Sequence, residues 1–233
     1  MDDITGFLKD ELLCHGADLA GFGDLTALPA EVREGLPVGV CVAVKYPKEV
    51  IRGIAALPTR EYYEYYDKLN ERLDMLVTLG AEALETSGYR AVAKTREQVA
   101  RDETEYQTLL PHKTVATRAG LGWIGKCALL VTPLYGSMVR ISSILTDAPL
   151  RCAKPVDTSQ CSACMECAQA CPGGAVSGKA WSADTPRETF YDAIKCRRTA
   201  RARALQGFGV EISQCGKCIE ACPYTKRYLD QED

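Results

Sequence analysis

Long hydrophobic runs are missing from this sequence. A helix that crosses a bilayer needs about 18 or more consecutive apolar residues, and the longest candidate here is residues 38–44. The amino terminus, Met-Asp-Asp-Ile, has no basic flank followed by an apolar segment. We therefore expect no signal peptide and no membrane partner, and we expect a cytoplasmic protein whose thiols stay reduced.

The sequence also lacks a net positive charge and a high cysteine content. The net charge is −3 and the pI is about 5.6, whereas a general nucleic-acid-binding domain usually has a pI above about 9. The 12 cysteines in 233 residues fall below the roughly 8–10% that is typical of disulfide scaffolds. These shortages argue against a nucleic-acid binder and a disulfide framework, and they leave the thiols available as metal ligands.

The cysteines that are present follow a regular spacing near the carboxyl end. Residues 161–172 read Cys-x2-Cys-x2-Cys-x3-Cys-Pro, and residues 215–223 read Cys-x2-Cys-x3-Cys-Pro. The first run has the spacing of bacterial ferredoxins, in which three cysteines hold one iron–sulfur cluster and the fourth binds a second cluster. Two such runs predict two [4Fe-4S] clusters.

The second run lacks its leading cysteine, because Ile212 stands in that place. Cys196, between the two runs, is the obvious replacement. Crossing the ligands as ferredoxins do predicts two sets of four. Cluster A takes Cys161, Cys164, Cys167 and Cys222, and cluster B takes Cys171, Cys196, Cys215 and Cys218.

Zinc is the main alternative metal, because thiolates also hold structural zinc. Zinc ribbons do not require the x2, x2, x3, proline rhythm, and that rhythm favours the clusters. The remaining cysteines lie outside both runs and are expected to be ordinary buried thiols. They are Cys14, Cys41, Cys127 and Cys152.

Helices alternate with strands over the rest of the chain. Apolar spacing predicts helices at residues 3–14, 60–86 and 112–119, strands at 38–44, 89–93, 127–131 and 138–145, and a loop with a short helix at 21–37. A turn at 132–136 is expected to join the last two strands. We predict an α+β fold of α/β type with two domains, 1–148 and 149–233.

A glycine-rich stretch, residues 120–126, formally matches the dinucleotide-binding pattern G-x-G-x-x-G. That pattern needs a strand before the glycines and a helix after them, because the phosphate sits at the helix amino terminus. Here the predicted order is helix, glycines, strand. We therefore expect the glycines to allow a sharp turn or the close approach of a large flat ligand.

These motifs together resemble those of the epoxyqueuosine reductases. The resemblance is carried by residues 112–126, 129–133, 135–137 and 144–147, followed by the double-cluster cysteines with the detached Cys196. It implies a nitroreductase-like domain that holds base-off cobalamin, a ferredoxin-like double [4Fe-4S] domain, and a relationship to the reductive dehalogenases.

The resemblance also implies roles for individual side chains. Those implied to contact cobalamin are Tyr62, Tyr63, His112, Gly122, Trp123, Gly125, Lys126 and Ser137. Epoxyqueuosine reductases carry an aspartate proton donor before the glycines, and counting back without gaps reaches Tyr106. Reductive dehalogenases use a tyrosine as the acid, and a tyrosine with a pKa near 10 stays protonated at neutral pH.

Each of these residues has a structural alternative. Tyr106 is alternatively a packing aromatic, Tyr62 and its neighbours helix core, His112 a capping or packing residue, and Lys126 a solvated side chain. The basic run at residues 195–203 is either a solvated helix face or a contact for an anionic cofactor, substrate or redox partner near cluster B.

The leading hypothesis is a cobalamin-dependent reductase. An external low-potential donor of ferredoxin or flavodoxin type would reduce the clusters, and a small-molecule or nucleoside-type substrate would be reduced at the corrinoid. The sequence stops soon after Cys222, without the helical-repeat tail of epoxyqueuosine reductases, so tRNA is not an expected substrate. An electron carrier without a substrate and a flavin-dependent reductase stay open as alternatives.

Overall fold

The computed structural model describes residues 3–99 and 106–231 of the chain. The chain divides into two compact units, each built from separate stretches of sequence. Unit 1 comprises Met1–Val44, Leu69–Gly122 and Arg140–Val156, and unit 2 comprises Lys45–Lys68, Trp123–Val139 and Asp157–Asp233. These units interleave along the chain, whereas the domains predicted at 1–148 and 149–233 are contiguous. That division stays a prediction.

A four-stranded sheet lies at the centre of unit 1. Its strands are β1 (Leu19–Asp24), β2 (Val38–Lys45), β6 (Val139–Thr146) and β3 (Ala91–Lys94), in the order β1-β2-β6-β3. β1 pairs antiparallel with β2, and β3 pairs antiparallel with β6. β2 is buried from Val38 to Val44, because its apolar, Val-rich sequence suits a strand that is covered on both faces.

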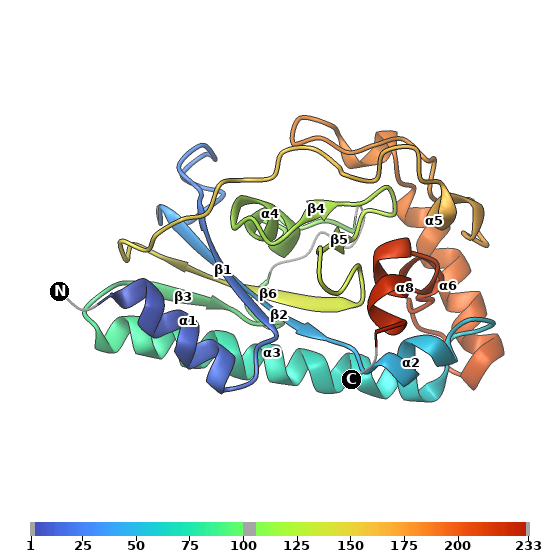
Figure 1. Cartoon of the computed structure of the whole chain (residues 1–233), viewed down its shortest axis with the longest axis horizontal. Helices are drawn as coiled ribbons and strands as arrows, with labels where there is room; N and C mark the ends of the chain where they lie inside the picture. Colours follow the sequence, from blue (N-terminus) through green and yellow to red (C-terminus); the bar gives the residue numbers. More distant parts are fainter. Residues whose placement is uncertain (1–2, 100–105, 232–233) are drawn as a thin grey trace. The chain divides into compact units, whose positions relative to one another are not determined.

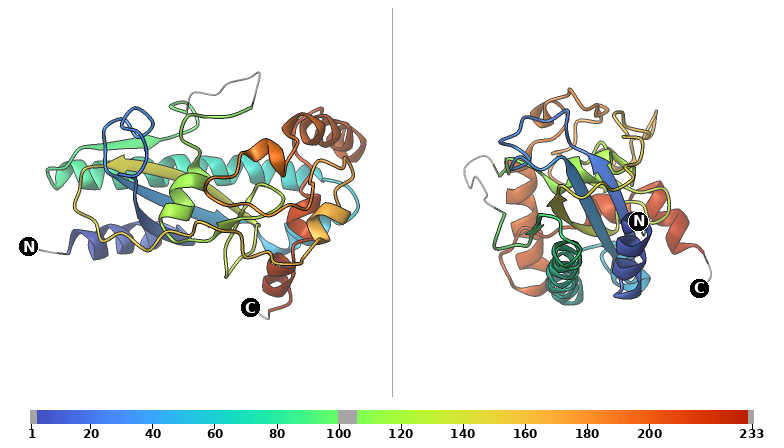
Figure 2. Two further views of the ribbon diagram at one scale, coloured as in Figure 1. Left: turned by 90° about the horizontal axis from the view of Figure 1, so that it is seen from above. Right: turned by 90° about the vertical axis from the view of Figure 1, so that its left-hand side faces the viewer.

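Helices cover both faces of this sheet (Figures 1 and 2). α1 (Ile4–Cys14) and α3 (Arg60–Thr86) lie on one face, and α4 (His112–Arg118) lies on the other. A Cβ on Gly80 of α3 would lie 2.7 Å from the Ile144 side chain and 3.2 Å from Leu12. α3 therefore packs closely against β6 and α1, and only glycine leaves enough room at this point.

Unit 2 consists mainly of short helices and loops. These are α2 (Lys48–Gly53), a two-stranded ribbon of β4 (Trp123–Ile124) and β5 (Leu130–Val131), α5 (Glu166–Gln169), the 3₁₀ helix Arg187–Thr189, α6 (Ala193–Phe208), α7 (Lys217–Glu220) and α8 (Pro223–Leu229). The Asp192 side chain caps α6 by accepting from the backbone N of Lys195 at 2.8 Å, and Gly209 ends it in the left-handed conformation.

The predicted helices at 3–14, 60–86 and 112–119 are confirmed, as are the strands at 38–44 and 138–145. The turn expected at 132–136 is confirmed, whereas the strand expected at 127–131 is confirmed only in its last two residues. β5 is only two residues long and pairs with β4, with Val131 opposite Trp123. The turn is closed by two hydrogen bonds, since the backbone N–H of Thr132 and that of Gly136 each donate to the carbonyl oxygen of the other residue.

Strand β1 falls where a loop was expected. Gly21 and Gly23 looked like loop residues, but a Cβ on Gly23 would lie 2.6 Å from the backbone N of Ala119. The glycine lets the end of α4 approach the strand closely, which is a known reason for glycine inside a strand. Within the described ranges, no helix has the length and apolar composition needed to cross a membrane.

Candidate metal centre

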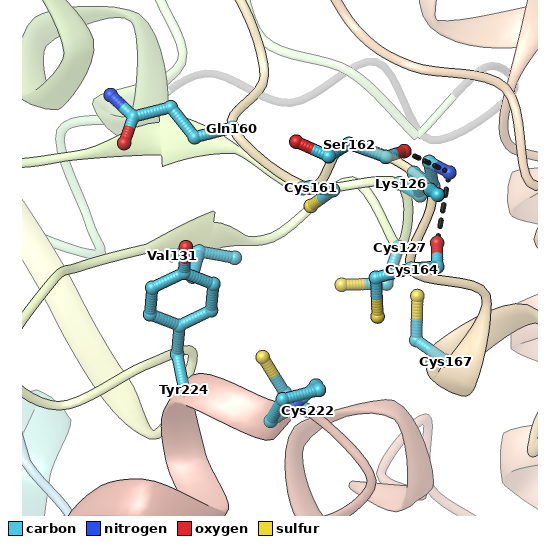
Figure 3. Close-up of a pocket in the computed structure, with 13 residues that line it drawn as sticks. Lys126, Cys127, Val131, Gln160, Cys161, Ser162, Cys164, Cys167, Cys222 and Tyr224 are labelled. Carbon is cyan, nitrogen blue, oxygen red and sulfur yellow. Dashed lines mark hydrogen bonds between the residues drawn. The ribbon is translucent and has the colours of Figure 1, made fainter.

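A cavity of about 380 Å³ in unit 2 is lined by five cysteine side chains (Figure 3). Four of them are the residues predicted to hold cluster A, namely Cys161, Cys164, Cys167 and Cys222. The fifth is Cys127. Thiols from three separated segments therefore meet around one space, as the ligands of a soft metal centre must.

Lys126 holds the loop that carries Cys161 and Cys164. Its side chain is buried, with 5% of the residue exposed. Its Nζ donates hydrogen bonds to the carbonyl oxygens of Ser162 at 3.0 Å and Cys164 at 2.8 Å. A buried ammonium group is costly unless hydrogen bonds and negative charge compensate it. Cysteine thiolates beside it fit that requirement, and burial argues against the solvated lysine.

Two aromatic rings pack beside Cys161. Trp123 is fully buried and donates a hydrogen bond from Nε1 to the Cys161 Sγ at 3.4 Å. Its ring meets the Tyr224 ring edge to face, with 4.9 Å between the centroids. Hydrogen bonds to ligand sulfurs are one of the determinants of cluster potential. Trp123 is thus placed to influence a cluster bound at Cys161.

The turn at residues 132–136 positions the start of α8, where Cys222 lies. The backbone N of Ser137 donates to the Thr225 Oγ1 at 3.1 Å. Burial raises the pKa of the Cys222 thiol, while hydrogen bonds from the Thr225 backbone and the Ser137 side chain act in the opposite direction. Those donors favour the thiolate, which is the form that binds metal.

The four cysteines predicted for cluster B also lie near one another. Burial raises the pKa of the Cys196 thiol, and the neighbouring Cys171 and Cys215 raise it further. Cys218 and Cys171 pack against a small buried group that contains Cys127. Cys171 of the first run is therefore beside the ligands predicted from the later part of the sequence, as the crossed arrangement requires. Which sulfurs bind iron stays a prediction.

Tyr191 is a neighbour of Cys196 that the sequence reasoning missed. Burial, followed by the charge of Cys196, raises the pKa of its phenol. The hydroxyl therefore stays protonated, and its hydrogen bond to Cys196 lowers the pKa of that thiol. Tyr191 reaches this position through an isolated backbone bridge to Val176, a long-range pairing that no local motif marks.

Cys127 was expected to be an ordinary buried thiol. It is buried, with 4% exposed, but it lines the cavity and packs with Cys167 in one buried group, against which Cys218 also packs. The sequence reasoning missed it because spacing rules count only cysteines within a run. The available signal was its position directly after Gly125 and Lys126.

The donor set fits a multinuclear cluster better than a single ion. A zinc ion binds four ligands at about 2.0–2.3 Å, so its ligands must converge on one point. Among the described residues, no three His, Cys, Asp or Glu side chains form such a group. Four thiols around a wider cavity suit the larger cage of a [4Fe-4S] cluster.

Comparison with known families supports this assignment. A family model described as a 4Fe-4S double cluster binding domain matches residues 160–225. The matched region contains all eight cysteines predicted as ligands. The carboxyl-terminal part of the chain is therefore a double-cluster [4Fe-4S] domain.

Curated relatives extend the similarity beyond this domain. Epoxyqueuosine reductase from Listeria monocytogenes is 31% identical over 170 residues, which cover 70% of this chain and 39% of that protein. The Pseudomonas aeruginosa enzyme of the same name is 24% identical over 217 residues, or 89% of this chain and 56% of that protein. The chain is epoxyqueuosine reductase-like. It spans less than two thirds of the length of these relatives.

Several solved structures have the same fold as this epoxyqueuosine reductase-like chain. The reductive dehalogenase NpRdhA has a TM-score of 0.73 at 18% identity, covering 97% of this chain and 32% of that one. An epoxyqueuosine reductase solved with a tRNA-Tyr stem loop has a TM-score of 0.62 at 20% identity, covering 95% and 65%. The α+β fold is thus shared with both groups, and the chain is structurally related to reductive dehalogenases.

Four of the residues implied to contact cobalamin lie around the cluster A thiols. Trp123 and Lys126 hydrogen-bond to Cys161 and to its loop. The position of a Cβ on Gly125 is 3.7 Å from the Cys161 Sγ, and the backbone N of Ser137 donates to the Thr225 Oγ1 in the helix that begins directly after Cys222. Their surroundings favour a role at cluster A, and their contact with cobalamin stays a prediction.

The other implied contacts lie elsewhere. Tyr62 is 5% exposed and packs on Tyr46 with 5.2 Å between ring centroids, and Tyr63 stacks on Phe208 at 5.7 Å. In unit 1, the His112 Nδ1 lies 2.9 Å from the Ser143 Oγ, and Gly122 follows α4. These contacts match the packing alternatives given above, while leaving the cobalamin roles as predictions.

Tyr106 lies directly after the undescribed residues 100–105. It belongs to unit 1, has a positive φ of 53° and is 41% exposed. A positive φ is unusual for a residue other than glycine. The exposed side chain is less buried than the packing alternative would require. Its role as the acid stays a prediction.

Proposed function

We propose that this chain is an oxidoreductase that uses two [4Fe-4S] clusters to supply electrons to a base-off cobalamin, at which a small-molecule or nucleoside-type substrate is reduced. The clusters rest on the double-cluster match and the cysteine-lined cavity. Cobalamin rests on likeness to proteins such as a reductive dehalogenase whose structure is described as suggesting B12-dependent dehalogenation. The activity is proposed because the chain spans only part of its relatives.

The observation that carries this proposal is the cysteine-lined cavity, with the Lys126 ammonium group and the Trp123 N–H beside its thiols. When bound there, an iron–sulfur cluster carries single electrons. The chain's own contribution is to hold the four sulfurs in place. It also puts the Lys126 ammonium group and the Trp123 N–H beside them. Both residues are buried, and both groups stabilise negative charge on the neighbouring sulfurs.

Tyr106 is the proposed proton donor to the reduced substrate. Its hydroxyl would deliver one proton and would be reprotonated from solvent, to which the side chain is open. His112, Gly122, Tyr62 and Tyr63 are the proposed contacts for the corrinoid, as the resemblance implies. None of these roles depends on the assignment of the cluster ligands.

The proposed electron donor is an acidic carrier protein of the ferredoxin or flavodoxin type. α6 carries five lysine and arginine residues and no acidic residue, in a chain whose net charge is −3. Its exposed side includes Lys195 and Arg198, flanked by Ile194, which is 67% exposed, and Leu205, which is 53% exposed. Cys196, a predicted ligand of cluster B, lies on the same helix. A basic surface next to a cluster suits an acidic partner.

Metal analysis tests the proposed function. The protein would be purified anaerobically from cells supplied with cobalamin, and iron and cobalt would be measured on one sample. About eight irons and about one cobalt per chain are expected for two four-iron clusters and one corrinoid. The matched variant Cys164→Ser should lose about half of the iron, because only cluster A loses a ligand, and Cys41→Ser should lose none.

Other outcomes would contradict specific parts of the proposal. Eight irons without cobalt, and no corrin retained when hydroxocobalamin is added, would mean that the chain is an electron carrier. Flavin absorption in place of corrin absorption would indicate a flavin-dependent reductase. Zinc in place of iron would overturn the clusters themselves.

A further inference from the structure

Cys127 is a ninth thiol placed between the two predicted ligand sets of unit 2. It packs with Cys167, a predicted ligand of cluster A, in one buried group, and Cys218, a predicted ligand of cluster B, packs against that group. It also lines the cavity with the cluster A thiols (Figure 3). Neither cysteine run includes it.

The backbone holds this thiol in a defined position. The N–H of Gly125 donates to the Leu129 carbonyl, and the N–H of Ala128 donates back to the Gly125 carbonyl, each at 2.9 Å. Ala128 has a positive φ of 61°, a conformation that costs energy for any residue with a Cβ. The turn is therefore tight enough to impose this conformation, and it directs Cys127 inward rather than toward solvent.

The immediate surroundings of Cys127 are sulfur and apolar atoms. Cys127, Cys167 and Val176 form one buried group, against which Leu129 and Cys218 pack. The position of a Cβ on Gly125 is 3.6 Å from the Cys127 Sγ and 3.7 Å from the Cys161 Sγ. A thiol is a weak hydrogen-bond donor. Cysteine sulfurs that bind metal are deprotonated, so the Cys127 S–H would be the donor in a hydrogen bond to either ligand.

We propose that Cys127 is not a cluster ligand but a hydrogen-bond donor to the ligand sulfurs, and that it raises the reduction potential of cluster A and, to a smaller extent, of cluster B. Reduction adds negative charge to a cluster, and a donor to its sulfurs stabilises that charge. Cluster A is expected to respond more because Cys127 lines its cavity. This inference rests on the two clusters of the proposed function.

The test is a redox titration of the anaerobically purified full chain, monitored by EPR, with iron measured on each sample. Cys127→Ala should keep about eight irons and should titrate at a more negative potential than the wild-type protein, with the larger shift in cluster A. Cys127→Ser, which keeps a donor, should titrate above Cys127→Ala. The matched control is Cys41→Ala, because Cys41 is also fully buried but lies on β2 in unit 1; its potentials should match those of the wild type.

Three results would overturn the inference. One is a full iron content in Cys127→Ala with unchanged potentials. The second is the loss of iron in both Cys127 variants, which would make this residue a ligand. If Cys127→Ala does not fold, Cys127→Ser decides the question. A hydroxyl is a stronger donor than a thiol, so this variant should titrate at a more positive potential than the wild-type protein. Unchanged potentials in Cys127→Ser are the third result. A wild-type chain without eight irons would instead refute the proposed function.

Discussion

Two glycines of unit 2 share one backbone conformation but differ in their surroundings. Gly136 has a φ of 57° and Gly174 a φ of 58°. A Cβ on Gly136 would lie 2.2 Å from the backbone N of Thr225, in the first turn of α8, whereas nothing lies within 4 Å of a Cβ on Gly174. The pair therefore separates the cost of a strained φ from the cost of a steric clash.

We expect Gly136→Ala to disturb cluster A and Gly174→Ala to leave it intact. The clash at Gly136 must move α8, and Cys222 moves with it, whereas Gly174→Ala costs only the left-handed strain of about 1–2 kcal/mol. The measurement is iron content together with thermal unfolding under anaerobic conditions. Equal iron content and equal destabilisation in the two variants would show that this turn does not position Cys222.

At the scale of elements, α6 combines a predicted cluster ligand with an exposed basic surface. Several of its cations already have partners, since Arg201 pairs with Glu211 at 2.9 Å and Arg197 donates to the Ser213 Oγ at 3.1 Å. Exposed pairs of this kind contribute little to stability. Charge changes on the helix should therefore affect association with a charged partner more than they affect folding.

The double variant Lys195→Glu/Arg198→Glu should slow reduction of the clusters by an acidic flavodoxin or ferredoxin about tenfold or more at low ionic strength, because steering by opposite charge is lost. Added salt should narrow the difference. Reduction by photoreduced deazaflavin, a small reductant, should be unchanged. The control Lys179→Glu changes charge at an exposed loop residue outside α6. An equal loss of rate in that variant would rule out α6 as the docking surface.

Elements with a strong local pattern could be predicted from the sequence. The apolar stripe of α3 and the Val-rich run of β2 gave their positions closely, because local periodicity is sufficient for such elements. β1 could not be recognised, because the use of Gly23 becomes visible only once α4 packs against it. The role of Cys127 was hidden for the same reason, since its sulfur neighbours lie far away in the sequence.

At the scale of the whole molecule, the two units should respond differently to the loss of iron. Unit 1 has a sheet with a buried apolar strand, whereas unit 2 has short helices around thiols. Metal that is bound only by the folded form contributes its binding free energy to folding. Unit 2 should therefore depend on iron far more than unit 1.

Hydrogen exchange before and after anaerobic removal of iron by a chelator checks this expectation. Exchange should speed up in Trp123–Val139 and Asp157–Asp233 of unit 2, while the amides of β2 stay protected. The intact holoprotein, carried through the same procedure without chelator, is the control. A uniform loss of protection in both units would show that they unfold together.

The cysteines and the residues that surround them come from separate parts of the sequence. Residues 160–225 carry the double-cluster match, but Trp123, Lys126 and Ser137, which hydrogen-bond to residues inside that segment, lie outside it. Recombination between related genes that exchanged only the cysteine-rich segment would leave cluster A with the neighbours of a different parent. The glycine stretch and the cysteine segment should therefore be inherited as a pair, and an engineer who transplants this redox module must move both.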